Sequence, residues 1–440
     1  MNARVLWKIA LLVLLTANSA SGVVKVIGFR HRHAGEKALS RADLNLAYQS
    51  FRSTLNWEPG DASTHILIGR AISLAQANGL PLEPLEGRQP EERFRIGLET
   101  VTRGIDLNPA DSWAWFNLAD FHQGFRTGRL RLAKMIRAGE MAGRPATGPE
   151  PVAPAGPDPE DAVSVAAALK ALELEPDHFF YRDFLAKLYW DRGLMQDAAR
   201  EISESMAAWP RIETHGILEN DALIADLAGP VLDGIARSAS SPYAGPVMAA
   251  RARARILERV GRLGESVEAW GELRRLGDKI VEAECDLELG KLEMQRGNPE
   301  ESLKHLTRAA AEAANEAQGI WALYYIGIIH SQQANHAEAV RFLRLHLARA
   351  PDSYAGYQAL AGELERIGES AEAEKLYIAA VRRFPDNPSA YLSVIQQMRS
   401  HGRSKQAISY AAALRKVSPD YEGTDSLIMA LTEESARKAP

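Results

Sequence analysis

The stretch AEAEKLYIAAVRRFPDNPSAY, residues 371–391, decides the fold. Its first part predicts an amphipathic helix, because Ala373 and Ala380 share a face with Tyr377 between them. Pro385 ends that helix, since proline lacks an amide hydrogen and its ring clashes with a continuing turn. The same pattern of small residue, large residue and proline recurs 34 residues upstream and, in part, 34 residues downstream, at Ala339, Leu343 and Pro351 and at Ala407 and Pro419. A pattern at one fixed spacing predicts an array of similar structural units.

Residues 354–387 contain one complete unit. An apolar stripe at helical spacing indicates its first helix, through Tyr357, Leu360, Ala361 and Leu364. Gly368 ends this helix, and the stripe around Tyr377 forms the second one. Because such a pair of helices buries only one side, it must stack against neighbouring pairs. The sequence therefore predicts an all-α fold of the solenoid type.

This pattern resembles the tetratricopeptide repeat (TPR) family, whose 34-residue unit is a helical hairpin. The resemblance implies an α-solenoid of stacked antiparallel helix pairs, a TPR-like superhelix. It covers most of residues 38–421; it is most complete over 250–421, clear over 179–210 and interrupted elsewhere. In the unit 320–353 the fitting positions are Leu323, Ile326, Gly327, Ala339, Leu343 and Pro351, and His346 replaces a small residue.

The sequence predicts five consecutive segments. Residues 1–37 are a signal or anchor segment with a basic juxtamembrane stretch, and residues 38–210 are an N-terminal array of TPR-like helix pairs with inserted loops at about 78–92 and 143–160. Residues 211–249 are a degenerate repeat or a joint, residues 250–421 a C-terminal TPR array, and residues 422–440 a capping helix and tail. Within the N-terminal array, the stretch SWAWFNLADF predicts one helix and residues 130–142 a separate extra helix.

The N-terminus predicts contact with a membrane. Two basic residues, Arg4 and Lys8, precede an apolar run over residues 9–15 and small residues over 17–22, which is the order found in secretory leaders. A second apolar stretch over residues 23–29 extends the run toward the ~20 residues that span a bilayer. We favour an uncleaved anchor in the inner membrane, with the repeats on the extracytoplasmic side. The alternative is a secreted or periplasmic protein, cleaved near residue 20. A buried N-terminal helix of a cytosolic protein ranks third.

Composition and motifs argue against several classes of function. A net charge of −5 carries no polybasic signature, so no nucleic-acid partner is expected. Cys285 is the single cysteine, which excludes an internal disulfide and a thiol-rich metal site. The eleven histidines are scattered, and no phosphate loop, zinc spacing or nucleophile elbow occurs. We therefore expect no enzymatic activity, no cofactor and no metal.

The remaining candidate surface is the concave wall, which the first helix of each pair lines in the family. The candidate binding residues are Trp321, Tyr324, Tyr325 and Ile328 in one unit, Phe180, Lys187 and Trp190 in another, and Trp113 and Phe116 after Pro109. Aromatic anchors with a few charges suit the capture of a peptide or helix. The competing interpretation is that individual aromatic side chains fill gaps between adjacent repeats.

These observations favour a non-enzymatic protein-interaction scaffold of the cell envelope, which recruits partners through the concave face. A role in polysaccharide or envelope assembly follows only from the layout of similar bacterial proteins. The alternative is a module that holds a glycan or another extended ligand, with Trp113, Trp115, Phe180 and Trp190 stacking on it. A catalytic protein of unrecognised type ranks last. The subtype that clamps a terminal carboxylate is not expected, because Lys291 is the only basic residue at the corresponding positions.

Overall fold

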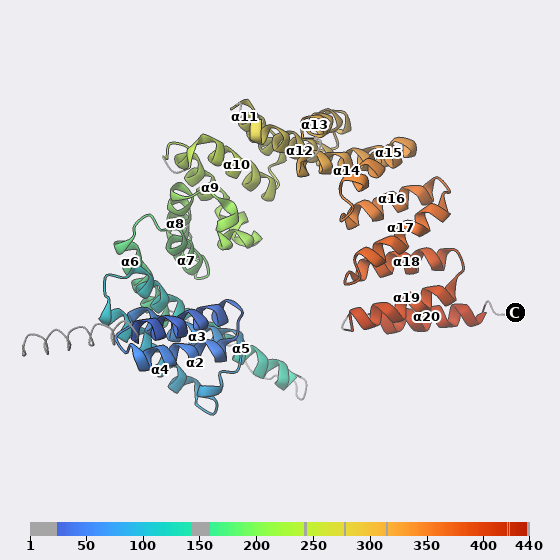
Figure 1. Ribbon diagram of the computed structural model, residues 1–440. Helices are drawn as coiled ribbons and strands as arrows, with labels where there is room; N and C mark the ends of the chain where they lie inside the picture. The colour runs from blue at the N-terminus through green and yellow to red at the C-terminus, as the bar shows by residue number, and fades with distance from the viewer. Residues whose placement is uncertain are drawn as a thin grey trace, which may run out of the picture. The chain divides into compact units, whose positions relative to one another are not determined.

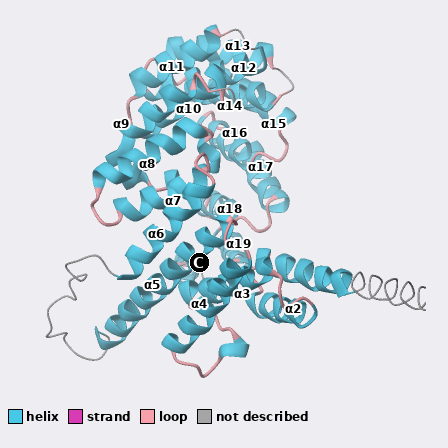
Figure 2. Ribbon diagram, turned by 90° about the vertical axis from the view of Figure 1, so that its left-hand side faces the viewer, coloured by secondary structure: helices cyan, strands magenta, loops and turns pink. Residues whose placement is uncertain are grey.

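The computed structural model describes residues 24–141, 159–241, 244–276, 279–313, 316–419, 421 and 423–437. Throughout these residues the regular secondary structure is helical, and short loops join the helices (Figure 1, Figure 2). The prediction of an all-α solenoid built from stacked antiparallel helix pairs is confirmed. The chain divides into two compact units, Met1–Gly245 and Pro246–Pro440.

The first unit contains a helix over residues 24–40, then α2 (Leu44–Trp57), α3 (Ala62–Asn78), η1 (Glu83–Leu85), α4 (Pro90–Leu107), α5 (Ser112–Met141), α6 (Pro159–Leu174), α7 (Phe179–Trp190), α8 (Met195–Ala208), η2 (Ile212–Thr214), η3 (Gly216–Glu219) and α9 (Asp221–Ser238). Successive helices pack against each other, and α3 also contacts α5. The helices α2 to α5 share one buried core, to which each contributes several residues, among them Phe51, Ile72, Val101 and Phe121.

The helix over residues 24–40 packs against α2. Its contact face carries glycine, and a Cβ on Gly35 would lie 2.4 Å from Cε1 of Phe51. Arg32 on the same helix forms an ion pair with Asp61, with 3.1 Å between Nη1 and Oδ2. Val26 and Phe29 lie on the opposite side and are more than half exposed. The described part of the predicted juxtamembrane segment is therefore part of the folded first unit.

The predicted membrane anchor is not supported by the structure. No helix within the described part of the chain is long and apolar enough to cross a bilayer. The apolar run over residues 9–15 and the small residues over 17–22, on which the anchor and leader predictions rest, lie outside the described residues. Both therefore stay predictions from the sequence.

The prediction of two helices between residues 112 and 142 is wrong, because α5 runs without a break from Ser112 to Met141. The glycines of this helix serve a close approach to α3. A Cβ on Gly124 would lie 2.0 Å from Oγ of Ser73, and one on Gly128 would lie 2.5 Å from the carbonyl oxygen of Gln76. These two glycines thus allow α3 and α5 to pack closely.

Residues 211–249 contain η2, η3 and α9 before the next helix begins. α9 continues past Pro230, which lies inside it. The backbone leaves the helical conformation at Leu227, with φ −112° and ψ 15°. This distortion accommodates the proline, whose ring would otherwise clash with the preceding turn.

The second unit consists of α10 (Gly245–Arg259), α11 (Leu263–Arg275), α12 (Lys279–Gln295), α13 (Pro299–Glu312), α14 (Ala317–Gln332), α15 (His336–Arg349), α16 (Tyr354–Arg366), α17 (Ser370–Arg383), α18 (Pro388–Ser400), α19 (Ser404–Val417) and α20 (Thr424–Arg437). From α11 onward each helix contacts the next, and α14 also contacts α12 and α16. We call α10, α12, α14, α16 and α18 the first helices of their pairs, and the helices that follow them the second helices.

The predicted ends of the helices in residues 354–387 agree with the structure. Gly368 lies in the turn between α16 and α17 with φ +85°, a conformation that suits glycine because it has no Cβ. Pro385 lies just after the end of α17. Leu360, Ala361, Leu364 and Tyr377 are all buried in the core that α16 and α17 share with their neighbours.

Candidate functional site

Three aromatic residues of α14 lie edge to face along the first-helix side of the second unit. The ring centroids of Trp321 and Tyr324 are 5.6 Å apart at an interplanar angle of 80°, and those of Tyr324 and Tyr325 are 5.4 Å apart at 80°. Trp321 is 38% exposed, while both tyrosines and Ile328 are partly buried. The structure therefore brings together the four residues of α14 that the sequence singled out, with Trp321 the most accessible. We call them the α14 aromatic patch.

Beneath this patch lies the buried imidazole of His346 from α15. Its centroid is 5.3 Å from that of Trp321 and 5.4 Å from that of Tyr324. Its Nδ1 lies 2.8 Å from the carbonyl oxygen of Ile320, and its Nε2 lies 2.9 Å from Oγ of Ser353. Burial lowers the pKa of His346, so the imidazole is neutral at pH 7 and donates to the carbonyl. The aromatic patch thus also covers a packing residue of its own repeat.

A charged cluster on α10 and α12 adjoins Tyr325. Nζ of Lys291 donates to Oε2 of Glu288 over 2.5 Å. Burial alone would lower the pKa of Lys291, yet that hydrogen bond and the charges of Glu288, Tyr325 and Glu258 raise it. Burial and the charge of Glu288 raise the pKa of Glu258. The one basic residue at a carboxylate-clamp position is therefore already engaged by a carboxylate of its own helix.

In the first unit, aromatic residues of α5 and α7 form a second cluster. Phe116 is at its centre, with ring centroids 5.3 Å from Trp113, 5.2 Å from Phe180 and 5.1 Å from Phe184. Phe180 is 44% exposed, whereas Phe116 is only 5% exposed. Tyr181 and its neighbours on α7 cover the Phe116 ring, so Phe116 itself is not accessible, and its part in binding stays a prediction.

Lys187 and Trp190 lie near the end of α7, and each has a polar partner. Nζ of Lys187 lies 2.5 Å from Oδ1 of Asp191 and 5.4 Å from the centre of the Trp190 ring. The indole Nε1 of Trp190 donates to Oδ2 of Asp226 on α9 over 2.9 Å. Both candidate residues are partly buried and have partners within the first unit. Their side chains can adjoin a bound ligand but are not free anchors.

The structure adds residues to this surface that sequence reasoning missed. Phe184 belongs to the cluster around Phe116, and the guanidinium of Arg70 on α3 lies 5.5 Å from the ring centre of Trp113. Burial raises the pKa of Asp120 on α5, and the charge of Arg70 partly offsets this. The i, i+4 spacing of Phe180 and Phe184 was a usable signal. No local sequence pattern connects Arg70 with α5.

Two observations on the described residues bear on metal binding and on nucleophilic catalysis. No three histidine, cysteine, aspartate or glutamate residues within them could hold a metal ion. Ser205, Asp183 and His215 lie together, but the Ser205 hydroxyl donates to Asp183 over 2.6 Å and the His215 Nε2 faces the carbonyl oxygen of Trp209 at 2.5 Å. A nucleophile needs a base at its hydroxyl and access to substrate, whereas these three side chains are buried and link α7 to α8.

Comparisons with known proteins agree with the repeat pattern. Residues 287–354 and 359–422 match the family model of the tetratricopeptide repeat. No curated protein matches the chain.

Solved structures of repeat proteins are also similar to the chain. Yeast Tom70 is 10% identical, with a TM-score of 0.41 over 93% of this chain and 96% of that one. MamA from Desulfovibrio magneticus is 14% identical, with a TM-score of 0.35 over 40% of this chain and 97% of that one. YrrB, described as a TPR protein with an unusual peptide-binding site, is 12% identical, with a TM-score of 0.34 over 46% of this chain and 99% of that one.

Proposed function

We propose that this protein is a non-enzymatic scaffold that recruits protein partners through the first-helix side of its repeats. The observation that carries the proposal is the α14 aromatic patch, where an accessible indole stands beside two partly buried tyrosines. The patch lies within the region that matches the tetratricopeptide repeat, a family whose members mediate protein–protein interaction.

The chemistry of the patch suits a protein partner. Trp and Tyr are enriched among the residues that dominate binding energy, because a large rigid side chain gains much contact area at a small entropic cost. The Lys291–Glu288 pair and Glu258 lie beside Tyr325 and supply polar groups at the edge of the patch. An apolar centre with a charged rim is the usual composition of a protein–protein interface.

The first unit offers a second anchor of the same kind. Phe180 is 44% exposed and rests on Phe116, so its ring is held in place before any partner arrives. A side chain fixed in advance loses little conformational entropy on binding. We therefore infer that Phe180 contributes to partner binding, while Phe116 supports it from below.

The alternative of a glycan in the groove receives less support. Trp115, which was a candidate for stacking on a sugar, donates its indole N–H to the carbonyl oxygen of Pro109 over 2.9 Å. Trp190 donates its own N–H to Asp226. Two of the four aromatic residues named for this role thus already have polar partners inside the first unit.

The proposal is tested by capturing partners with the full chain and with single alanine variants. Trp321→Ala and Phe180→Ala remove the two accessible anchors. Leu345→Ala and Leu169→Ala are matched controls. Leu345 is 39% exposed on the second helix α15, and Leu169 is 45% exposed on α6, the helix before α7. We expect the anchor variants to lose a partner that both controls retain. If all four variants recover the same proteins in the same amounts, the first-helix side is not the binding surface.

Membrane attachment in the cell envelope remains part of the proposal. Its support is the sequence of residues 1–22, where basic residues precede an apolar run. The orientation with the repeats on the extracytoplasmic side follows from the same segment. Extraction of membranes with alkaline carbonate tests the attachment. Protease treatment of cells whose outer membrane has been removed, but whose inner membrane is intact, tests the orientation. Release of the chain by carbonate would contradict the anchor.

A further inference from the structure

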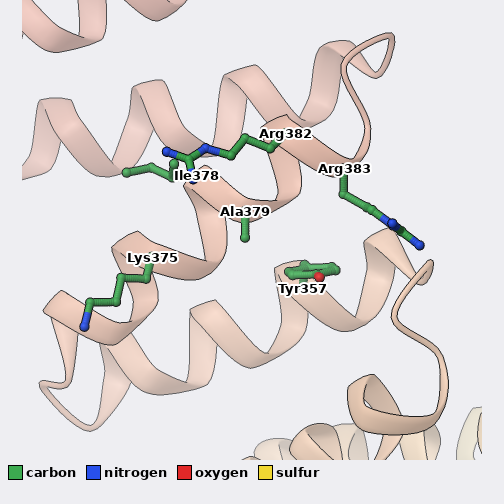
Figure 3. A pocket seen from close by; sticks show the side chains of 6 residues that line it. All are labelled: Tyr357, Lys375, Ile378, Ala379, Arg382 and Arg383. Atoms are coloured by element: carbon green, nitrogen blue, oxygen red, sulfur yellow. The ribbon is translucent and has the colours of Figure 1, made fainter.

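A pocket of about 430 Å³ opens beside the second helix α17. Five of its lining residues come from α17 and the sixth, Tyr357, comes from α16, as Figure 3 shows. The lining residues are Tyr357, Lys375, Ile378, Ala379, Arg382 and Arg383. We call it the α17 pocket. Its lining combines three basic side chains with apolar ones and contains no acidic residue.

The basic charge of this pocket is only partly balanced by the protein itself. Arg383 is engaged, because its Nε donates to Oδ1 of Asp352 over 2.6 Å. No acidic partner of Lys375 or Arg382 is present among the residues that the structure describes. Two cations of the pocket lining are therefore free to meet incoming anionic groups.

The acidic residues of α17, Glu372 and Glu374, form ion pairs with arginines outside this helix. Glu372 accepts from Nη2 of Arg344 on α15 over 2.9 Å. Glu374 accepts from both terminal nitrogens of Arg403, at 2.8 Å and 2.5 Å, and this lowers the pKa of Glu374. These pairs draw the carboxylates of α17 away from Lys375. The local positive charge thus stands in contrast to the net charge of −5 for the whole chain.

Tyr357, Ala379 and Ile378 supply the apolar part of the pocket lining. Figure 3 shows Ala379 directed toward the Tyr357 ring, with Arg382 extending along α17 toward Ile378 and Arg383 pointing the other way. The Tyr357 ring is supported by Phe384, whose centroid lies 6.0 Å away at 77°. A fixed aromatic surface near two separate cations suits a peptide in which acidic residues flank an apolar one.

We propose that the α17 pocket binds an acidic peptide segment of a partner protein. Because Figure 3 shows Lys375 and Arg382 extending from α17 in different directions, one acidic residue of the segment pairs with Lys375 and another with Arg382, and an apolar side chain between them lies on Tyr357 or Ile378. Charge-assisted hydrogen bonds from ammonium and guanidinium groups to a carboxylate are stronger than those between neutral groups. This site lies mainly on a second helix, so it is separate from the α14 aromatic patch and goes beyond the function proposed above.

The probe is a fluorescein-labelled peptide of sequence Gly-Glu-Asp-Leu-Glu-Asp-Gly, titrated with the full chain and followed by fluorescence anisotropy. A peptide with Gln and Asn in place of the acidic residues is the neutral control. The test variant is Lys375→Gln/Arg382→Gln. The matched control is Lys405→Gln/Lys416→Gln, which removes the same charge from exposed positions of α19. Circular dichroism checks that each variant keeps its helices.

We expect the acidic peptide to bind and the neutral one not to bind. Removing both free cations should weaken binding about tenfold, and the α19 control and Trp321→Ala should bind like the unmodified chain. Added sodium chloride should weaken binding, because salt screens exposed charges. Equal affinity of the test variant and the unmodified chain, an equal loss in the α19 control, or no saturable binding would overturn the proposal. So would displacement by inorganic phosphate beyond that of sodium chloride at equal ionic strength, since it would show a site for small anions.

Discussion

His346 and Gly356 are adapted to each other. His346 takes the position that Ala380 has in the next repeat, and Gly356 takes the position of Ala390. A Cβ on Gly356 would lie 2.8 Å from Cδ2 of His346, so the imidazole fits only because that Cβ is missing. In the next repeat the two alanines are both buried and together fill the equivalent space. One repeat thus has histidine and glycine at the two positions where the next repeat has two alanines.

The neutral state of His346 makes the stability of the second unit depend on pH. Burial lowers the pKa of His346 in the folded chain, whereas the unfolded chain has the ordinary value of about 6.5. Below that value the unfolded state binds more protons than the folded state, so the free energy of unfolding falls as the pH falls. Urea unfolding at pH 8 and pH 5.5 should therefore show a smaller loss for His346→Gln than for the unmodified chain. Equal losses would show that His346 titrates normally in the folded protein.

Cys285 is predicted to be unreactive while the chain is folded. It is fully buried on α12. Burial, followed by the charges of Glu284 and Asp286, raises the pKa of its thiol to about 12. Because the thiolate is the reactive form, Ellman's reagent should label native protein very slowly and denatured protein within seconds. Rapid labelling without denaturant would contradict the burial of this thiol.

At the scale of residues, the sequence predicts which side chains lie on a first helix but not which of them are covered. Trp321 and Phe116 occupy similar positions in their helices, yet only Trp321 is accessible. The difference arises because Tyr181 and Phe184 come from another helix to pack on Phe116. Contacts between helices that are distant in sequence decide accessibility, and a single sequence contains no direct record of them.

At the scale of elements, proline and glycine residues predict the ends of helices well where the glycine has a positive φ. Gly368 meets that condition between α16 and α17. Gly124 and Gly128 do not, because they lie inside α5 and allow close packing on α3. A glycine that ends a helix and a glycine that allows two helices to pack closely look the same in the sequence. The boundary after α16 was predicted correctly, whereas the continuous α5 was missed.

Two helical glycines of the second unit allow a matched test of this distinction. A Cβ on Gly327 would lie 2.7 Å from Cγ of the buried Leu343, whereas a Cβ on Gly362 would meet nothing within 4 Å. Gly327→Ala should cost roughly 1–3 kcal/mol through overpacking between α14 and α15. Gly362→Ala should raise stability by up to ~1 kcal/mol, because alanine favours the helix. Chemical denaturation measures both, and a neutral Gly327→Ala would mean that the two helices are less closely packed than described.

At the scale of the whole molecule, the buried cores identified here each belong to one unit. The core of α2 to α5 lies in the first unit, and two further cores lie in the second, one around Leu306 and Ile326 and one around Leu360 and Val394. Repeat proteins are stabilised by contacts between neighbouring repeats. Each of these three cores can therefore form within its own unit.

A fragment of residues 244–440 is accordingly expected to fold alone. Circular dichroism should show a helical spectrum, and thermal unfolding should be cooperative, because the helices from α12 to α20 bury two cores without residues of the first unit. The fragment should also bind the acidic peptide, since the α17 pocket lies within it. A fragment that is unfolded at 25 °C would show that the two units depend on each other.

The central claim is that partners bind on the first-helix side at the α14 aromatic patch. The most direct measurement places the photo-crosslinking amino acid benzoylphenylalanine at position 321 in one strain and at position 345 in another. These positions are equally exposed but lie on the first helix α14 and the second helix α15. The account predicts a crosslinked partner protein from position 321 and none from position 345. Crosslinking from position 345 alone, or none from position 321, would contradict it.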